Sequence, residues 1–311
     1  MLGATSKAFF HSLAQIGVLQ RMASRYGMAP GGGFARRFIA GESVDEAVGA
    51  VKDLPSRGLL LTMDYLGESV GTAVEADAAT RDYLGILDSI VRSGIERNVS
   101  VKLTQLGLDV DRATCVDNLR RILDPATEHG FFVRIDMENS TYTSVTLKIF
   151  ETLWDQGYRN IGVVLQSYLM RTDDDVKHLN AMGARVRLVK GAYKEPKSVA
   201  YQNKVDVDAA FVRAMERLLD EGTYPAIATH DPNMIDATKR YADHKGYTRN
   251  RFEFQMLFGI RRDLQTSLAA EGYPMRVYVP FGKQWFPYFM RRLGERPANV
   301  GFVLRGLVNE K

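Results

Sequence analysis

Cysteine is nearly absent from this sequence, since Cys115 is the single one among 311 residues. An intramolecular disulfide is therefore excluded, as is usual in a reducing compartment. No run of 18 apolar residues occurs, so no membrane-spanning helix is expected. Among residues 1–20, the apolar side chains are interrupted by Lys7 and His11, and no small-residue cleavage site follows them. Both features argue against a secretory signal. These absences predict a soluble cytoplasmic protein.

Charge of one sign is not concentrated anywhere. Lys+Arg number 41 against 37 Asp+Glu, for a formal net charge of +4, and no block of five like charges occurs. Dispersed charge argues against nucleic acid as a partner, but it is compatible with peripheral attachment to the inner face of the cytoplasmic membrane. Apolar residues make up 45% and charged residues 25%, which suits a globular chain with a large core.

Several common nucleotide and metal motifs are missing. No Gly-x-Gly-x-x-Gly follows an expected strand, and Gly31–Gly33 lie between helical stretches, which argues against a Rossmann dinucleotide site. The chain also lacks a Walker loop, a His-Glu-x-x-His helix and paired Cys-x-x-Cys motifs. No metal site is therefore expected.

Helical patterns dominate before residue 58. Apolar spacing over residues 5–25 predicts a helix, and a Pro-Gly-Gly-Gly breaker follows it. Residues 34–51 predict one or two further helices, the second opened by a capping box of Ser43 and Glu46. We expect residues 1–57 to form an N-terminal helical segment.

From residue 59 onward, short apolar and β-branched runs alternate with longer helical patterns. The eight runs are Leu59–Met63, Val99–Leu103, Phe131–Ile135, Ile161–Leu165, Arg185–Val189, Ala226–Thr229, Phe252–Gln255 and Arg276–Val279. Buried strands that alternate with helices pair in parallel, and the spacing of roughly 25 to 40 residues matches one βα unit. Residues 58–311 are therefore predicted to form an α/β, (βα)₈ TIM-type barrel as the catalytic domain.

In such a barrel the active site lies where the strands end. Each expected strand ends near an ionisable or amide side chain: Asp64 with Glu68, Lys102, Asp136, Gln166, Arg187 with Lys190, His230, Gln255 and Tyr278. Solvated loop charges alone would produce part of this pattern, so the whole set is more informative than any one member.

Three of these strand ends allow a more specific expectation. His230 is one of only five histidines, and its place at a strand end favours a ligand contact over a structural role. Arg185 and Arg187 share one strand face, with Arg187 nearer the mouth of the barrel. Asp64 and Glu68 are spaced as on one helical turn, where surface carboxylates are the ordinary expectation.

The last segment combines aromatic and basic residues. Pro287 suits a first helical turn, and Tyr288, Arg291 and Arg292 then fall on one side of that helix. Two adjacent guanidinium groups beside an aromatic ring suggest a carboxylate clamp against a flat apolar wall. An ordinary basic helix face is the alternative, and Glu295 is placed to pair with either arginine.

Six segments in order along the chain resemble the signature segments of the proline dehydrogenase family: Asp64–Glu68, Arg134–Met137, Arg187–Tyr193, Phe252–Leu257, Val277–Pro280 and Tyr288–Arg292. The resemblance covers about residues 58 to 305. The sequence ends where bifunctional relatives would begin an aldehyde dehydrogenase domain, so it resembles the monofunctional bacterial type.

This resemblance implies a distorted (βα)₈ barrel that binds FAD without a Rossmann motif. It implies oxidation of L-proline to Δ1-pyrroline-5-carboxylate, with electrons passed to a membrane quinone. A separate pyrroline-5-carboxylate dehydrogenase would then act downstream.

The resemblance also implies roles for single residues. It implies that the proline carboxylate is bound by Lys102, Arg291 and Arg292. It implies that the pyrrolidine ring is packed by Leu257, Tyr278 and Tyr288. As catalytic residues it implies Asp136, which would support Lys102 and the flavin side, and Arg187, which would lie near the flavin N5. Contact with FAD is implied for Met137, Gln166, Val189, Lys190, Gly191, Thr229 and His230. Glu68 resembles the gating carboxylate that pairs with an arginine of the last helix.

Three other functions fit parts of the pattern. A Schiff-base aldolase would use Lys102 or Lys190, because a strand-end lysine near other cations is what that chemistry needs. A metal-dependent hydrolase would use Asp64, Asp136 and His230, although one histidine is little for a zinc site. A regulatory barrel without flavin is the non-enzymatic alternative.

Overall fold

The computed structural model describes residues 27–28 and 33–295. The helix predicted over residues 5–25 lies outside this part of the chain. Ahead of the barrel come the short helices η1 (Phe34–Arg37), α3 (Val44–Val51) and η2 (Pro55–Arg57). Ser43 caps α3, as predicted, by accepting from the Glu46 N–H at 3.2 Å. The Glu46 carboxylate accepts from Arg36 at 3.1 Å, so the reciprocal contact expected of a capping box is replaced by an ion pair.

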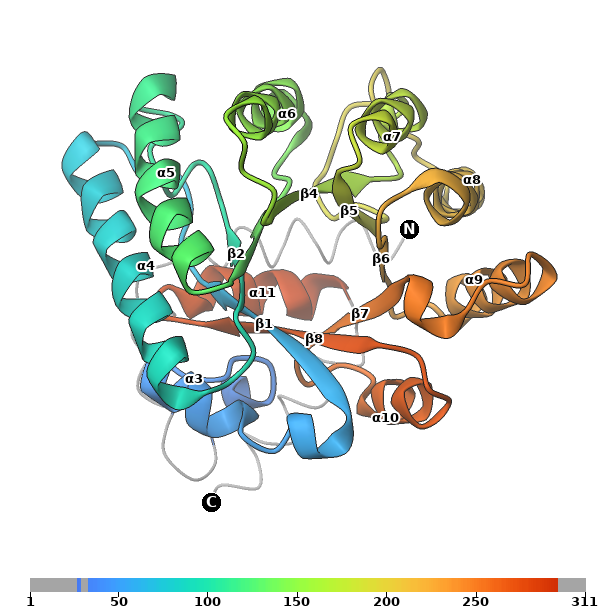
Figure 1. Ribbon diagram of the computed structural model, residues 1–311, viewed down its shortest axis with the longest axis horizontal. Helices are drawn as coiled ribbons and strands as arrows, with labels where there is room; N and C mark the ends of the chain where they lie inside the picture. Colours follow the sequence, from blue (N-terminus) through green and yellow to red (C-terminus); the bar gives the residue numbers. More distant parts are fainter. Residues whose placement is uncertain (1–26, 29–32, 296–311) are drawn as a thin grey trace.

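Eight parallel strands close into a barrel in the order in which they follow one another along the chain (Figure 1). The strands are β1 (Leu59–Tyr65), β2 (Asn98–Val101), β3 (Phe132–Ile135), β4 (Ile161–Gln166), β5 (Arg185–Val189), β6 (Ala226–Ala228), β7 (Glu253–Leu257) and β8 (Met275–Phe281). Each overlaps its predicted run, and the predicted TIM-type barrel is confirmed.

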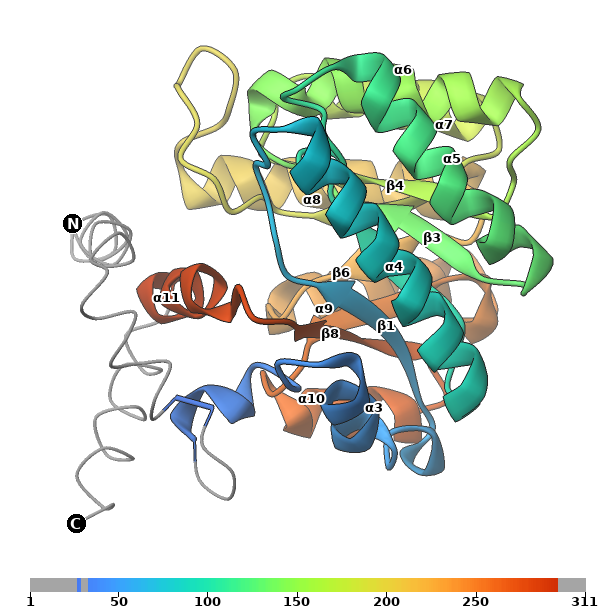
Figure 2. The ribbon, with the colours of Figure 1, turned by 90° about the vertical axis from the view of Figure 1, so that its left-hand side faces the viewer.

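A helix follows every strand, and all but the last of these helices cover the outside of the barrel (Figure 1). The helices are α4 (Ala73–Ser93), α5 (Arg112–Glu128), α6 (Ser140–Asp155), α7 (Thr172–Ala181), α8 (Lys204–Glu221), α9 (Pro232–His244), α10 (Arg262–Ala270) and α11 (Trp285–Glu295), with the short η3 (Arg249–Arg251) before β7. Figure 2 shows α11 across the end of the barrel toward which β8 runs.

The core lies between the strands and the helices. In α5, Cys115, Leu119, Ile122 and Ala126 recur at helical spacing and are fully buried, because that face packs on the sheet. The six residues of β4 are all buried, as expected for a strand covered on both faces. The helical spacing therefore specifies which side of a helix enters the core, and a continuous apolar run indicates a strand that is covered on both faces.

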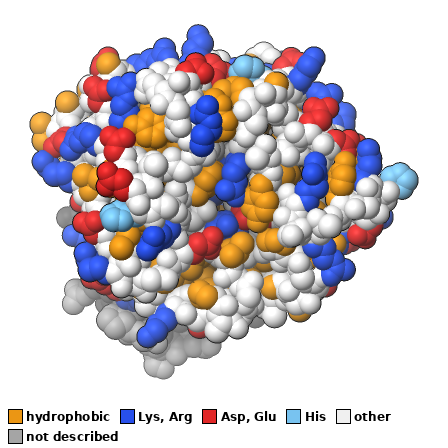
Figure 3. All heavy atoms as spheres, viewed as in Figure 1, with side chains coloured by type: hydrophobic (Ala, Val, Ile, Leu, Met, Phe, Trp, Pro, Cys, Tyr) orange, Lys and Arg blue, Asp and Glu red, His pale blue; other side chains and the backbone are white. Residues whose placement is uncertain are grey.

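Charged side chains fill the end of the barrel where the strands begin. Arg276 of β8 is buried and binds Glu253 of β7 through two bonds, at 2.9 and 3.0 Å. Arg185 of β5 lies over the ring of Phe132, 4.3 Å from its centroid. Figure 3 views the molecule from this end and shows acidic and basic side chains interspersed over the face. Because this end is filled, the space inside the barrel opens at the opposite end.

Candidate active site

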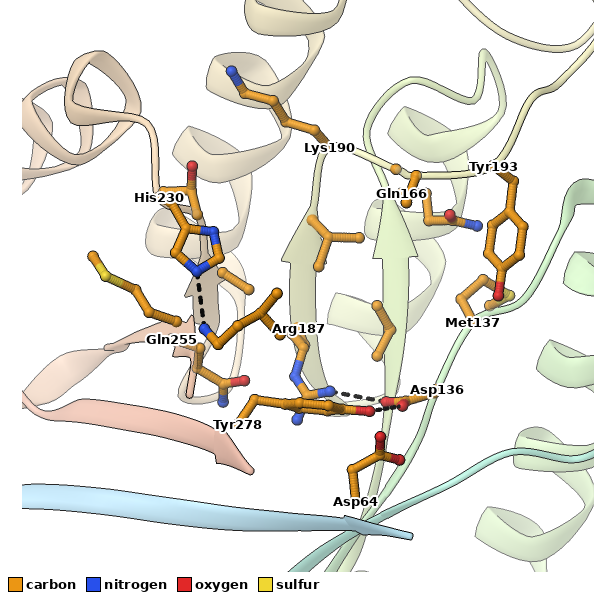
Figure 4. A pocket seen from close by; sticks show the side chains of 18 of the residues that line it. Asp64, Asp136, Met137, Gln166, Arg187, Lys190, Tyr193, His230, Gln255 and Tyr278 are labelled. Carbon is orange, nitrogen blue, oxygen red and sulfur yellow. Dashed lines mark hydrogen bonds and ion pairs between the residues drawn. The ribbon is translucent and has the colours of Figure 1, made fainter. Parts of the chain in front are cut away.

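A cavity of about 480 Å³ lies at the carboxyl ends of the strands (Figure 4). Fourteen of the residues to which the family resemblance gives a role line it: Lys102, Asp136, Met137, Gln166, Arg187, Val189, Lys190, Gly191, Thr229, His230, Leu257, Tyr278, Tyr288 and Arg292. They come from strand ends, from the loops that follow the strands, and from helix α11, so the closed topology brings together residues almost 200 positions apart. The structure thus places the predicted set around one space.

Within the described part of the chain, one predicted residue does not line this cavity. Glu68 is half-buried and lines a small adjoining cavity of about 20 Å³, together with Lys102 and Tyr288. The side chain of Arg291 lies outside the described part of the chain.

The expectation for Asp64 and Glu68 was wrong in two respects. They do not share a helical turn, because Asp64 belongs to strand β1 and Glu68 to the loop before α4. Asp64 is also not a surface carboxylate, since only 1% of it is exposed. The inward alternation of β1 carries Asp64 into the cavity wall, which the spacing alone did not reveal.

Lys102 is held between two carboxylates. Its Nζ lies 2.7 Å from Asp64 Oδ1 and 3.4 Å from Asp136 Oδ2. Burial opposes the charge of the ammonium group, but the nearby carboxylates outweigh it and hold the pKa of Lys102 well above its usual value. The raised pKa favours the protonated amine, which does not suit the nucleophilic role that an aldolase requires.

Asp136 is the centre of a buried hydrogen-bond network. Its Oδ1 accepts from Arg187 Nη1 at 2.8 Å, and its Oδ2 accepts from the Tyr278 hydroxyl at 2.6 Å (Figure 4). Arg187 also donates to Ser100 Oγ at 3.2 Å and lies over the Tyr278 ring. Burial, reinforced by Asp136 and Asp64, raises the pKa of Tyr278 well above its usual value, so its hydroxyl remains a donor.

The wall opposite this network is polar. The Leu257 N–H donates to His230 Nε2 at 2.9 Å, which assigns the imidazole proton to Nδ1 (Figure 4). Lys190 binds Asp231 at 2.6 Å and also contacts Asp208. Gly191 has φ +111°, a conformation that side-chain-bearing residues rarely adopt. Because Lys190 is engaged by two carboxylates, it too is a poor candidate for a Schiff-base nucleophile.

Helix α11 supplies the remaining wall. Tyr288 is buried, and the Arg292 guanidinium lies 5.3 Å from the centre of its ring. The helix is held from behind, where Phe289 packs on Phe38 and the Trp285 indole donates to Glu42 at 2.8 Å. The segment before the barrel therefore helps to position this wall.

Some lining residues were not assigned a role from the sequence. Asp231 directly follows His230, and Tyr193 closes a segment that carries the family resemblance, so both had a signal close by. Met256 also lies within such a segment, Phe252–Leu257, whereas Val164 is an apolar strand residue with no such signal. Within the described residues, no group of three or more His, Cys, Asp or Glu is placed to hold a metal ion, so the geometry does not support the hydrolase alternative.

Comparison with known proteins identifies the family. The family model described as proline dehydrogenase matches residues 47–305. The chain is 40% identical to proline dehydrogenase 2 of Bacillus subtilis, covering 98% of this chain and 99% of that protein. It is 42% identical to proline dehydrogenase of Deinococcus radiodurans, covering 88% and 90%, respectively.

A solved structure agrees with this result. The barrel resembles proline utilization A from Bdellovibrio bacteriovorus, with a TM-score of 0.78 and 30% identity. That match covers 84% of this chain and 32% of the solved one, so the chain spans about a third of that protein. The chain belongs to the proline dehydrogenase family, and its enzyme activity is that of a proline dehydrogenase.

Proposed function

We propose that the chain oxidises L-proline to Δ1-pyrroline-5-carboxylate with FAD as its cofactor. The observation that carries this proposal is the division of one cavity into two walls. Cationic and aromatic groups, among them Lys102, Arg292 and Tyr288, lie on one side, and the polar wall of Lys190 and His230 lies on the other. A small carboxylate substrate fits the first wall, and a large polar cofactor fits the second.

Buried polar atoms in the cavity wall support the cofactor assignment. Within the described residues, Arg187 Nε and Gln255 Oε1 are buried without a hydrogen-bond partner. Buried donors and acceptors without a partner are costly, so they are expected to bind a ligand. One donor and one acceptor fit a ligand that is rich in ring nitrogen and carbonyl groups. Bound FAD would supply the hydride acceptor. The residues that would hold it are Met137, Gln166, Arg187, Val189, Lys190, Gly191, Thr229 and His230.

Substrate positioning falls to the opposite wall. Lys102 and Arg292 would bind the proline carboxylate, with Arg291 as a third cation on the same helix. Leu257, Tyr278 and Tyr288 would pack against the pyrrolidine ring. Fixing the carboxylate end orients C5, the carbon that loses hydride, and such orientation is a large part of catalysis.

Asp136 would keep this arrangement rigid. It binds Lys102, Arg187 and Tyr278 at once, so it joins two residues proposed for the substrate to one proposed for the cofactor. No side chain is assigned as a general base, because Lys102 is already protonated and the Tyr278 hydroxyl keeps its proton. Glu68, in the adjoining cavity beside Tyr288, would act as the gate by pairing with an arginine of α11.

We also propose that the electrons pass to a membrane quinone from a cytoplasmic enzyme attached peripherally to the membrane. None of the helices in the described residues is both long and apolar enough to cross a bilayer. The product would be consumed by a separate pyrroline-5-carboxylate dehydrogenase.

The test is the visible spectrum of the purified protein. Flavin absorbance that bleaches when L-proline is added without oxygen is the expected result. The Bdellovibrio relative is described as inactivated by N-propargylglycine, and the same compound should inactivate this chain over time. A colourless protein that FAD does not reconstitute, but that borohydride traps with a carbonyl substrate, would instead establish the aldolase.

A further inference from the structure

The loop between β5 and α8, residues 190–203, forms part of the cavity wall through Lys190, Gly191 and Tyr193. It is longer than any other loop between a strand and the next helix in the described part of the chain. Figure 2 shows it standing out on the side that carries α11. A long loop keeps one shape only when specific contacts offset its conformational entropy. We propose that Glu195 is a positioning residue that fixes this loop for cofactor binding.

The Glu195 carboxylate reaches the start of helix α6. It accepts the backbone N–H of Ser140 at 2.7 Å, and its second oxygen accepts from the Ser140 hydroxyl. Ser140 is the first residue of α6, so its N–H has no partner within the helix. The cap residue Asn139 accepts from Thr141 at 3.1 Å, which leaves the Ser140 N–H to Glu195. The positive end of the helix dipole also favours a carboxylate at this position.

Tyr168 links Glu195 to the start of the loop. Its hydroxyl donates to Glu195 at 3.4 Å, and its N–H donates to the Lys190 carbonyl at 3.0 Å. A side-chain carbon at Gly191 would overlap the Tyr168 ring, so the loop backbone lies directly on that ring. Gln202, near the end of the loop, donates to the Glu195 carbonyl at 3.3 Å. Glu195 is therefore the point where the loop, α6 and Tyr168 are joined.

This arrangement has a consequence for the cavity. The loop is fixed at two points. Tyr168 contacts its start, Glu195 binds α6, and Lys190, Gly191 and Tyr193 lie between these two contacts. Met137, three residues before Ser140, lines the same cavity, so Glu195 connects two cavity-lining segments. With this contact in place, the loop is already ordered in the folded protein. Its conformational entropy is therefore lost on folding and not when the cofactor binds. The inference rests on the proposed binding of FAD.

The experiment breaks the contact from both sides. Glu195→Ala removes the carboxylate, and Ser140→Pro removes the N–H and hydroxyl donors while leaving the loop sequence unchanged. Proline is well tolerated at the first position of a helix, so α6 should persist. Ser198→Ala, an exposed change in the same loop, is the matched control. Glu195→Gln keeps an oxygen acceptor for the Ser140 N–H and should restore part of the wild-type behaviour.

Two readouts are measured on the protein as purified. Flavin release after dilution is followed by the fluorescence of free flavin, and trypsin cleavage after the exposed Lys197 reports loop opening. Both disrupting variants should release flavin about tenfold faster, as expected for the loss of a hydrogen bond to a charged group. Both should also be cut faster after Lys197, whereas Ser198→Ala should behave as wild type.

Wild-type release and cleavage in either disrupting variant would overturn the proposal, because each alone removes the contact. Equal effects of Glu195→Gln and Glu195→Ala would also overturn it. Wild-type protein that carries no flavin would contradict the proposed function instead. The cleavage comparison would then still decide whether Glu195 positions the loop. Far-UV circular dichroism establishes that each variant is folded.

Discussion

The Tyr278 hydroxyl donates to Asp136 Oδ2 across the barrel interior, over a distance of 2.6 Å. Tyr278 belongs to β8, and Asp136 directly follows β3, so the bond joins opposite sides of the barrel. The same carboxylate binds Arg187, which the family resemblance places near the reactive part of the flavin. The bond therefore couples the proposed substrate wall to the proposed flavin wall.

Tyr278→Phe should lower kcat/KM for proline by about ten- to a hundredfold while flavin content remains unchanged. The variant leaves Asp136 without one donor, and a hydrogen bond to a charged group contributes roughly 1.5–3 kcal/mol. Steady-state kinetics and the flavin-to-protein absorbance ratio provide the measurement. Tyr142→Phe is the matched control, because Tyr142 makes a similar bond of 2.7 Å to Asp109 outside the cavity. Equal kinetics in the two variants would remove Tyr278 from the proposed site.

Arg292→Met should raise KM for proline by about ten- to over a hundredfold and leave the flavin content near that of wild type. The methionine keeps much of the apolar stem but loses the charge that would bind the carboxylate. Arg262→Met is the control, since Arg262 also lies over an aromatic ring, 5.6 Å from the centre of Phe258, but it does not line the cavity. A wild-type KM for Arg292→Met would show that the carboxylate binds elsewhere.

The barrel was predictable because the strands and the helices have different hydrophobic patterns. β4, for example, is apolar over nearly its whole length, whereas α5 repeats apolar residues at helical spacing. The closed topology then follows from eight successive βα units, and it alone brings Lys102 and Arg292 to one cavity. Seven of the fourteen lining residues named above were therefore available from the ends of the predicted strands, and the others came from the last helix or from the family resemblance.

Contacts between distant loops were not predictable in this way. The burial of Asp64 depends on which way β1 alternates within the closed barrel, and the spacing of Asp64 and Glu68 suggested a helical turn instead. Glu195 binds Ser140, 55 positions earlier, through a loop whose course no local pattern specifies. Such partners depend on loop conformation, which hydrophobic periodicity does not encode.

The Glu253–Arg276 pair should make stability depend on pH. Burial opposes the Glu253 charge, but Arg276 outweighs it and lowers the pKa of Glu253 below its usual value of 4.5. Because the pKa is lower in the folded state, this stabilisation is present above pH 4.5 and is lost as the pH falls through the folded-state pKa. Glu253→Gln should cost about 1.5–3 kcal/mol at pH 7, because Arg276 loses a charged acceptor but keeps Glu96 as an ion-pair partner.

Denaturant unfolding from pH 7 down to pH 3 tests this prediction. The difference in free energy of unfolding between wild type and Glu253→Gln should shrink as the pH falls below about 4.5. Glu221→Gln, an exposed change at the end of α8, should follow the wild-type curve throughout. A difference that stays constant over this range would mean that the Glu253 charge contributes nothing.

Tyr288 should decide which cyclic amino acid is preferred. Its buried ring lies one helical turn before Arg292, so it would cover the part of the pyrrolidine ring away from the carboxylate. A phenol packed there leaves no space for a hydroxyl on C4. L-proline should therefore have a higher kcat/KM than trans-4-hydroxy-L-proline. An apolar pocket alone rejects an added hydroxyl only about a hundredfold, whereas a steric clash can exceed that.

Tyr288→Ser should narrow the preference, mainly because activity on proline falls when the apolar wall is lost. The measurement is kcat/KM for both substrates with both proteins. Tyr142→Phe, changed outside the cavity, should keep the wild-type ratio. An unchanged ratio in Tyr288→Ser would show that this ring does not contact the substrate. If the wild-type protein has the higher kcat/KM for hydroxyproline, the assignment of proline as the substrate is wrong. That result would require space at C4 where the buried Tyr288 ring is expected to lie.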